Sequence, residues 1–138
     1  MPDIRYCYID PNGGDITVVM TANNGLRAGG AFGLYTISKE RIEEWRIATG
    51  DDGRVTYTLR TGPGNLEGNE MAWRVKTCAF IPSATSGTIN LEITQGENLP
   101  SVSIPTTWDV INVPECSGGQ FMQKTFSLIF KTTGEEPS

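Results

Sequence analysis

The chain has 138 residues, of which 38% are hydrophobic and 20% charged, a balance typical of one globular domain with its own core. The net charge is −5, and residues 77–138 contain only two basic side chains. The sequence therefore has no basic stripe that could neutralise the phosphates of a nucleic acid. We therefore expect no nucleic-acid partner and no docking on anionic membranes, and no apolar run approaches the ~18 residues of a membrane span.

At the N-terminus, residues 1–5 show no basic segment followed by an apolar stretch. We therefore expect no signal peptide, which slightly favours an intracellular location without assigning a compartment. Further along, short runs rich in β-branched and aromatic residues alternate with turn sequences. These runs predict strands at residues 3–9, 15–22, 31–37, 43–49, 54–61, 71–80, 87–95, 107–113 and 121–132.

The elements predict an all-β fold, an antiparallel β-sandwich of about eight or nine strands. A closed β-barrel is the alternative. One domain spans residues 1–138, with residues 134–138 as a frayed tail. At most one short helical turn is expected near residues 38–43, where Ser38 would cap it.

The first turn is the candidate metal site. Asp10, Asn12 and Asp15 place oxygen donors at short spacing around two glycines, as at the start of a calcium loop. The bidentate glutamate of such a loop is missing. Asp-Pro and Asn-Gly are also ordinary turn sequences, so a plain turn is the default interpretation and no other cofactor is expected.

Residues 23–30 predict a Gly-rich loop that offers Asn24 and Arg27 as ligand-binding candidates. The glycines in this region precede a strand rather than a helix, so they do not form a phosphate-binding loop. Their small size allows another backbone or a ligand to approach closely.

The alternation of apolar and polar residues predicts two hairpins. The first turns at Gly53, which takes the left-handed conformation that glycine tolerates. This register sets Trp45 opposite Leu59 on a buried face. It also sets Glu44 opposite Arg60 as an exposed ion pair.

The second predicted hairpin joins its strands through a longer loop, residues 81–87. Its register places Val75 opposite Ile93 on the apolar face and Lys76 opposite Glu92 on the polar face. An apolar set and a complementary charge pair in one register favour this pairing over its neighbours.

The remaining ligand-binding candidates come from two places. Asn65 and Glu67 belong to a second Gly-rich loop, and Trp108 and Asp109 lie near a loop or sheet edge. Trp108 is the tryptophan expected to be exposed, because the other two fall on inward faces of the predicted hairpins.

The chain contains no histidine, which excludes Ser–His and Cys–His nucleophile systems and a His-based zinc site within it. Of the paired carboxylates, Asp51 and Asp52 occupy a turn. Glu67 and Glu70 remain a candidate pair for glycoside hydrolysis, with solvated surface acids as the default interpretation. We therefore expect a protein that is not an enzyme.

The three cysteines, Cys7, Cys78 and Cys116, leave two interpretations open. Either one disulfide forms and one thiol stays free, or all three are reduced, which is slightly favoured. Cys78 follows Arg74 and Lys76 on one strand face, where positive charge would lower its thiol pKa. No base adjoins it, so a structural cysteine is the default.

These observations predict a non-enzymatic binding module that recognises a carbohydrate or protein ligand through its Gly/Asn/Asp-rich loops. The alternative is a structural or self-assembling subunit that forms a homo-oligomer. A carboxylate-dependent hydrolase is the third hypothesis. The fold by itself does not choose among these three functions.

Overall fold

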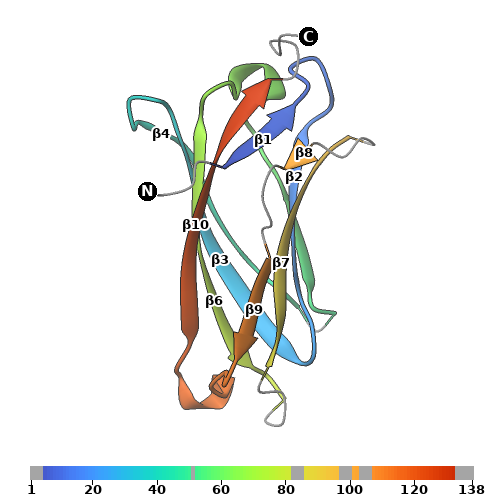
Figure 1. Ribbon diagram of the computed structural model, residues 1–138, viewed down its shortest axis with the longest axis vertical. Helices are drawn as coiled ribbons and strands as arrows, with labels where there is room; N and C mark the ends of the chain where they lie inside the picture. The colour runs from blue at the N-terminus through green and yellow to red at the C-terminus, as the bar shows by residue number, and fades with distance from the viewer. Residues whose placement is uncertain (1–4, 51, 82–85, 97–100, 103–106, 133–138) are drawn as a thin grey trace.

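Two β-sheets packed face to face make up the protein in the computed structural model, which describes residues 5–50, 52–81, 86–96, 101–102 and 107–132 (Figure 1). The predicted β-sandwich is confirmed, and the sheets do not close into a barrel. The described strands are β1 (Tyr6–Ile9), β2 (Ile16–Ala22), β3 (Leu26–Tyr35), β4 (Arg41–Ala48), β5 (Arg54–Thr58), β6 (Glu70–Ala79), β7 (Ser86–Gln95), β8 (Ser101–Val102), β9 (Thr107–Ile111) and β10 (Met122–Thr132).

One sheet has six strands in the order β4-β3-β6-β10-β1-β8, and the other has four in the order β5-β2-β7-β9. All pairs are antiparallel except β1 with β10, which run parallel. Two short 3-10 helices, η1 (Pro63–Asn65) and η2 (Cys116–Gly118), lie in connections. Within the described ranges, no helix is long and apolar enough to cross a membrane. The predicted frayed tail at residues 134–138 and the turn residue Asp51 lie outside the described residues.

The first predicted hairpin is wrong, because its two strands belong to different sheets. β4 pairs with β3, whereas β5 pairs with β2. Trp45 and Tyr57 are not neighbours in a ladder but stack across the sandwich, with ring centroids 4.5 Å apart. Glu44 forms its ion pair with Arg41 on its own strand instead of with Arg60.

The second predicted hairpin is wrong for the same reason. β6 lies between β3 and β10, and β7 lies between β2 and β9, so the connection crosses from one sheet to the other. Lys76 is in register with Gly29 and Gln123, and Glu92 with Val19. A strand with one apolar face shows the same alternation whether its partner lies beside it or across the core.

The hairpin that does form joins β3 to β4. β3 begins at Leu26, so the Gly-rich loop predicted for residues 23–30 is wrong beyond the turn at Asn24. The upper limit of one short helical turn near 38–43 holds, and no helical turn forms there. A tight turn closes there through the Thr36 N–H, which donates to the Glu40 carbonyl (2.9 Å).

Aromatic rings form a continuous row on the inner face of the larger sheet. Trp45, Phe32, Trp73 and Phe126 lie on β4, β3, β6 and β10 at directly paired positions. Their neighbouring rings are stacked, with centroids 5.2–5.8 Å apart. The buried surface of this row is a large part of the core, and its pairing aligns four strands at once.

A buried carboxylate connects the two sheets at the β4–β5 side. Glu43 is 9% exposed and accepts hydrogen bonds from the Tyr57 hydroxyl (2.6 Å), the Arg60 N–H (2.9 Å) and both the N–H and the hydroxyl of Thr61 (3.0 and 2.9 Å). Burial by itself raises the pKa of this carboxyl, but the hydrogen bonds outweigh burial and hold its pKa below the usual value. Glu43 therefore ties β4 to the segment that follows β5.

Gly53→Val should destabilise the domain by more than ~1 kcal/mol, because a β-branched residue is strained at positive φ. Gly53 has φ +72°, and a Cβ there would lie 2.4 Å from the Ala22 carbonyl oxygen. Urea unfolding followed by tryptophan fluorescence measures the change. Gly62→Val is the control, since Gly62 has an extended backbone and open space around it. Equal effects would contradict the argument.

Glu43→Gln should lower the unfolding free energy at pH 7 by about 2 kcal/mol or more, since hydrogen bonds to a charged acceptor are lost in a buried place. The folded-state pKa of Glu43 is lowered. Its stabilisation is therefore complete above the unfolded value of about 4.3 and disappears as the pH falls through the folded-state pKa.

Urea unfolding across this pH range tests the Glu43 prediction. The difference between wild type and Glu43→Gln should shrink on acidification. The neighbouring Glu44→Gln is the control and should cost under ~1 kcal/mol, because the ion pair of Glu44 with Arg41 is solvent-exposed. A difference independent of pH would refute the role of the ionised carboxylate.

Candidate functional site

The predicted ligand-binding residues do not come together. Asn24 is exposed in the β2–β3 turn, and Trp108 on β9 is half-buried and packed against the core rather than exposed. The Asp109 carboxylate accepts a hydrogen bond from the Thr88 hydroxyl (3.1 Å) on the neighbouring strand. These residues belong to the lower end of the sandwich in Figure 1.

Asn65 and Glu67 lie at the opposite, upper end, around η1 (Figure 1). Glu67 accepts hydrogen bonds from the Thr132 N–H (2.8 Å) and hydroxyl (2.9 Å) and is paired with Lys131 (3.5 Å). The Thr132 N–H and the other donors hold the pKa of Glu67 below its usual value. Glu70, its proposed catalytic partner, is paired with Lys39 (3.2 Å). Both carboxylates thus already have partners of their own.

The candidate calcium loop is organised as a turn. The Asp10 carboxylate accepts from the Asn12 N–H (2.9 Å), and the Gln95 side chain accepts from the Asp10 N–H (2.8 Å) and donates to the Gly14 carbonyl (3.1 Å). Asp15 is exposed at its end. In the part of the chain that the structure describes, no cluster of three or more Asp, Glu, Cys or His side chains could hold a metal ion. Calcium binding stays a prediction.

An open groove occupies the outer face of the six-stranded sheet, over β4, β3 and β6. Its floor is formed by small residues of β3, chiefly Gly29 and Ala31. The hollow above them has a volume of about 470 Å³. The small residues noted in the sequence therefore do allow close approach, but on a sheet face and not in a loop.

Basic side chains surround this floor. Ala31 is in register with Arg46 on β4 and with Arg74 on β6, and Gly29 is in register with Lys76. All three basic side chains are exposed, and the described residues that line the hollow include no carboxylate. A chain with net charge −5 thus carries a local cationic surface.

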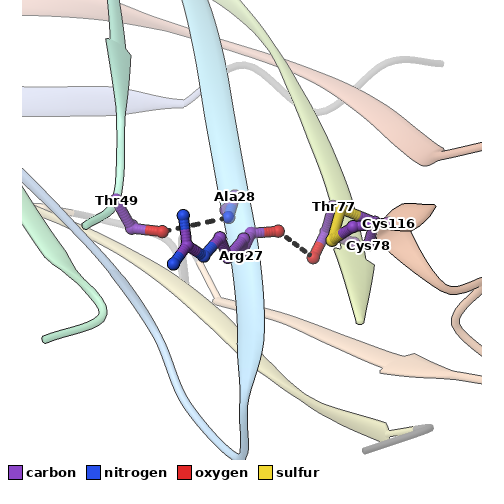
Figure 2. Close-up of a disulfide and its surroundings, with 6 residues drawn as sticks. All are labelled: Arg27, Ala28, Thr49, Thr77, Cys78 and Cys116. Atoms are coloured by element: carbon purple, nitrogen blue, oxygen red, sulfur yellow. Dashed lines mark hydrogen bonds between the residues drawn. A yellow bond between two sulfur atoms is a disulfide. The ribbon is translucent and has the colours of Figure 1, made fainter. Parts of the chain in front are cut away.

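Arg27 closes the lower end of the groove. The Thr77 hydroxyl donates to the Arg27 carbonyl (2.8 Å), and the Thr49 hydroxyl accepts from the Ala28 N–H (3.1 Å), as Figure 2 shows. The Arg27 guanidinium lies over the Phe80 ring, 3.7 Å from its centroid, in a cation–π contact. Of the ligand-binding candidates named from the sequence, Arg27 is the one that lines this groove.

A disulfide joins the same end of the groove to η2. Cys78 of β6 is bonded to Cys116 (Figure 2), so the slight preference for three reduced thiols is wrong, and Cys78 has no thiol to act as a nucleophile. Cys7 is the free cysteine, and burial raises the pKa of its thiol to about 12. Phe121, which follows η2, also lines the groove and is 54% exposed.

The groove continues upward along β3 as a second hollow of about 370 Å³. The two hollows share Ala31, Arg46 and Arg74. Gly33 and Tyr35 line the upper part, and a Cβ on Gly33 would lie 2.5 Å from the Tyr35 hydroxyl oxygen, so the Tyr35 side chain lies over Gly33. The outer face of β3 is therefore a trough from Arg27 to Tyr35.

No protein-family model matches the chain, and no curated protein or solved structure is significantly similar to it. The function must therefore be argued from the groove itself. Sequence reasoning missed Arg46, Arg74 and Lys76 as site residues. It used Arg74 and Lys76 as neighbours of Cys78, and Lys76 also as the partner of Glu92 in the second predicted hairpin. The sequence did contain one signal: Arg74 and Lys76 are two residues apart, which places both on the same face of a strand.

The double variant Cys78→Ser/Cys116→Ser should lose about 4 kcal/mol of unfolding free energy, the loop-closure entropy of a link that spans 38 residues. Urea unfolding measures the loss. Thiol titration of the denatured, unreduced wild type checks the bond itself and should find Cys7 alone reactive. Three reactive thiols per chain would contradict the disulfide.

Proposed function

We propose that the protein is a non-enzymatic binding module whose ligand is anionic and lies on the outer face of the six-stranded sheet. The observation that carries the proposal is the first hollow, in which Arg46 and Arg74 flank Ala31 without a carboxylate among the described lining residues. The second hollow is lined by one carboxylate, Glu44, which is paired with Arg41 (2.8 Å). The proposed binding site is therefore a sheet face, whereas the sequence predicted binding through loops.

The geometry suits one oxyanion held above Ala31. Arg46 and Arg74 lie on strands to either side of β3, so their backbones are two strand spacings apart, about 10 Å. Two long side chains of that separation can converge on one carboxylate, sulfate or phosphate, and guanidinium groups bind such groups with paired hydrogen bonds. The methyl group of Ala31 leaves room for it.

Charge balance supports the same conclusion. Arg46 and Arg74 share one sheet face on either side of β3, and Lys76 lies two residues beyond Arg74 on the same face. Like charges gathered on one face repel one another. An anionic ligand relieves this repulsion. The first hollow supplies cations and small residues but no carboxylate, histidine or free thiol among its described lining, which favours binding over catalysis.

Arg46→Gln/Arg74→Gln should weaken binding of an anionic probe at least about tenfold, as expected when two charge-assisted contacts are lost. The probes are polygalacturonate, polyglutamate and oligo-dT, titrated calorimetrically at low and moderate salt. Affinity should fall with salt less steeply in the variant than in wild type.

Arg54→Gln/Arg60→Gln is the matched control, because it removes the same charge from β5 and the segment after it, and neither residue lines the two hollows of the trough. Binding in this control should stay within about twofold of wild type. The proposal fails if none of the three probes binds, or if both double variants lose affinity equally.

A further inference from the structure

We infer that the ligand is an acidic polysaccharide chain that lies lengthwise along β3. This inference rests on the proposed function and names its ligand class. Its first support is the shape of the trough: the two hollows merge at Ala31, and the upper one ends where the Tyr35 side chain lies over Gly33. The open floor from Arg27 to Ala31 covers four residue steps of a strand, or about 13 Å. Such a trough suits an extended polymer better than a single small anion.

The cations follow one another along the lower half of the trough, whereas the upper hollow is lined by Glu44, which is in register with Gly33. Arg46 and Arg74 lie level with Ala31, Lys76 lies level with Gly29, and Arg27 follows at the lower end. Each step is two residues along the strand, or about 7 Å. A ligand that uses all three levels must carry anionic groups at repeated intervals, as a polymer of acidic sugars does.

The backbone of the floor favours a sugar over a peptide. β3 pairs with β4 on one side and β6 on the other, so its N–H and C=O groups are used in the two ladders. An extended peptide gains much of its affinity by adding a strand to a free edge, and this face offers none. Recognition must come from side chains, and Gln123 and Thr125 of β10 add polar groups beside Lys76 and Arg74.

The placement of aromatic rings favours a sugar over single-stranded nucleic acid. Single-strand binders stack successive bases on rings between their cations. Here the open floor of the trough is formed by Gly29 and Ala31, and the rings stand at its ends: Phe121 at the lower end and Tyr35, whose side chain lies over Gly33, at the upper end. Terminal rings can pack against sugar faces while hydroxyl and acidic groups occupy the centre.

The test is calorimetric titration with size-fractionated oligogalacturonates, their methyl-esterified forms, dextran sulfate, polyglutamate and oligo-dT. We expect affinity for oligogalacturonates to rise at least about tenfold with chain length and then to reach a plateau. Methyl esterification should abolish binding. Phe121→Ala and Tyr35→Ala should each reduce the gain in affinity with chain length.

Ala31→Glu should abolish binding because it places a carboxylate between the two arginines. Thr56→Glu, on the exposed face of β5, is the matched control and should bind like wild type. Binding of polyglutamate or oligo-dT in preference to both acidic polysaccharides, or affinity without length dependence, overturns the inference and leaves the proposed function standing. The absence of binding to every probe overturns both.

Discussion

The stacked row of Trp45, Phe32 and Trp73 sets the register on which the rest of the structure depends. These rings pair across β4, β3 and β6 on the inner face of the larger sheet. Because successive side chains of a strand point to opposite faces, the residues one position away occupy the outer face. The same register therefore places Arg46, Ala31 and Arg74 side by side, and a shift of one residue would both expose the aromatic row and dismantle the groove.

The connections between the two sheets are held by specific contacts beside the groove. Most consecutive strands alternate between the two sheets. Glu43 accepts four hydrogen bonds from the segment around Tyr57 and Thr61, and the Cys78–Cys116 bond anchors η2 beside β6. A face that packs on aromatic rings below and is tied at both sides has little conformational entropy to lose.

Local sequence predicted much of the strand inventory but not the pairing. Strand runs such as residues 87–95 and 54–61 correspond closely to β7 and β5, because β-branched and aromatic residues between glycine turns are a strong local signal. Both predicted hairpins were wrong because an apolar face turned toward a core looks the same in an adjacent strand and in a strand of the opposite sheet. The Gly-rich start of β3 was taken for a loop since glycines lack the side chains that mark a strand.

By itself, the sequence determined the all-β class, the sandwich, the inward faces of Trp45 and Trp73, and the positive φ of Gly53, because each follows from residue type and alternation within a few neighbours. Only the tertiary structure decided which strands pair, that Cys78 meets Cys116, and that Arg46 and Arg74 share one groove although 28 positions separate their numbers. These depend on contacts between distant segments, where the burial of whole faces and not the preference of any single residue selects the arrangement.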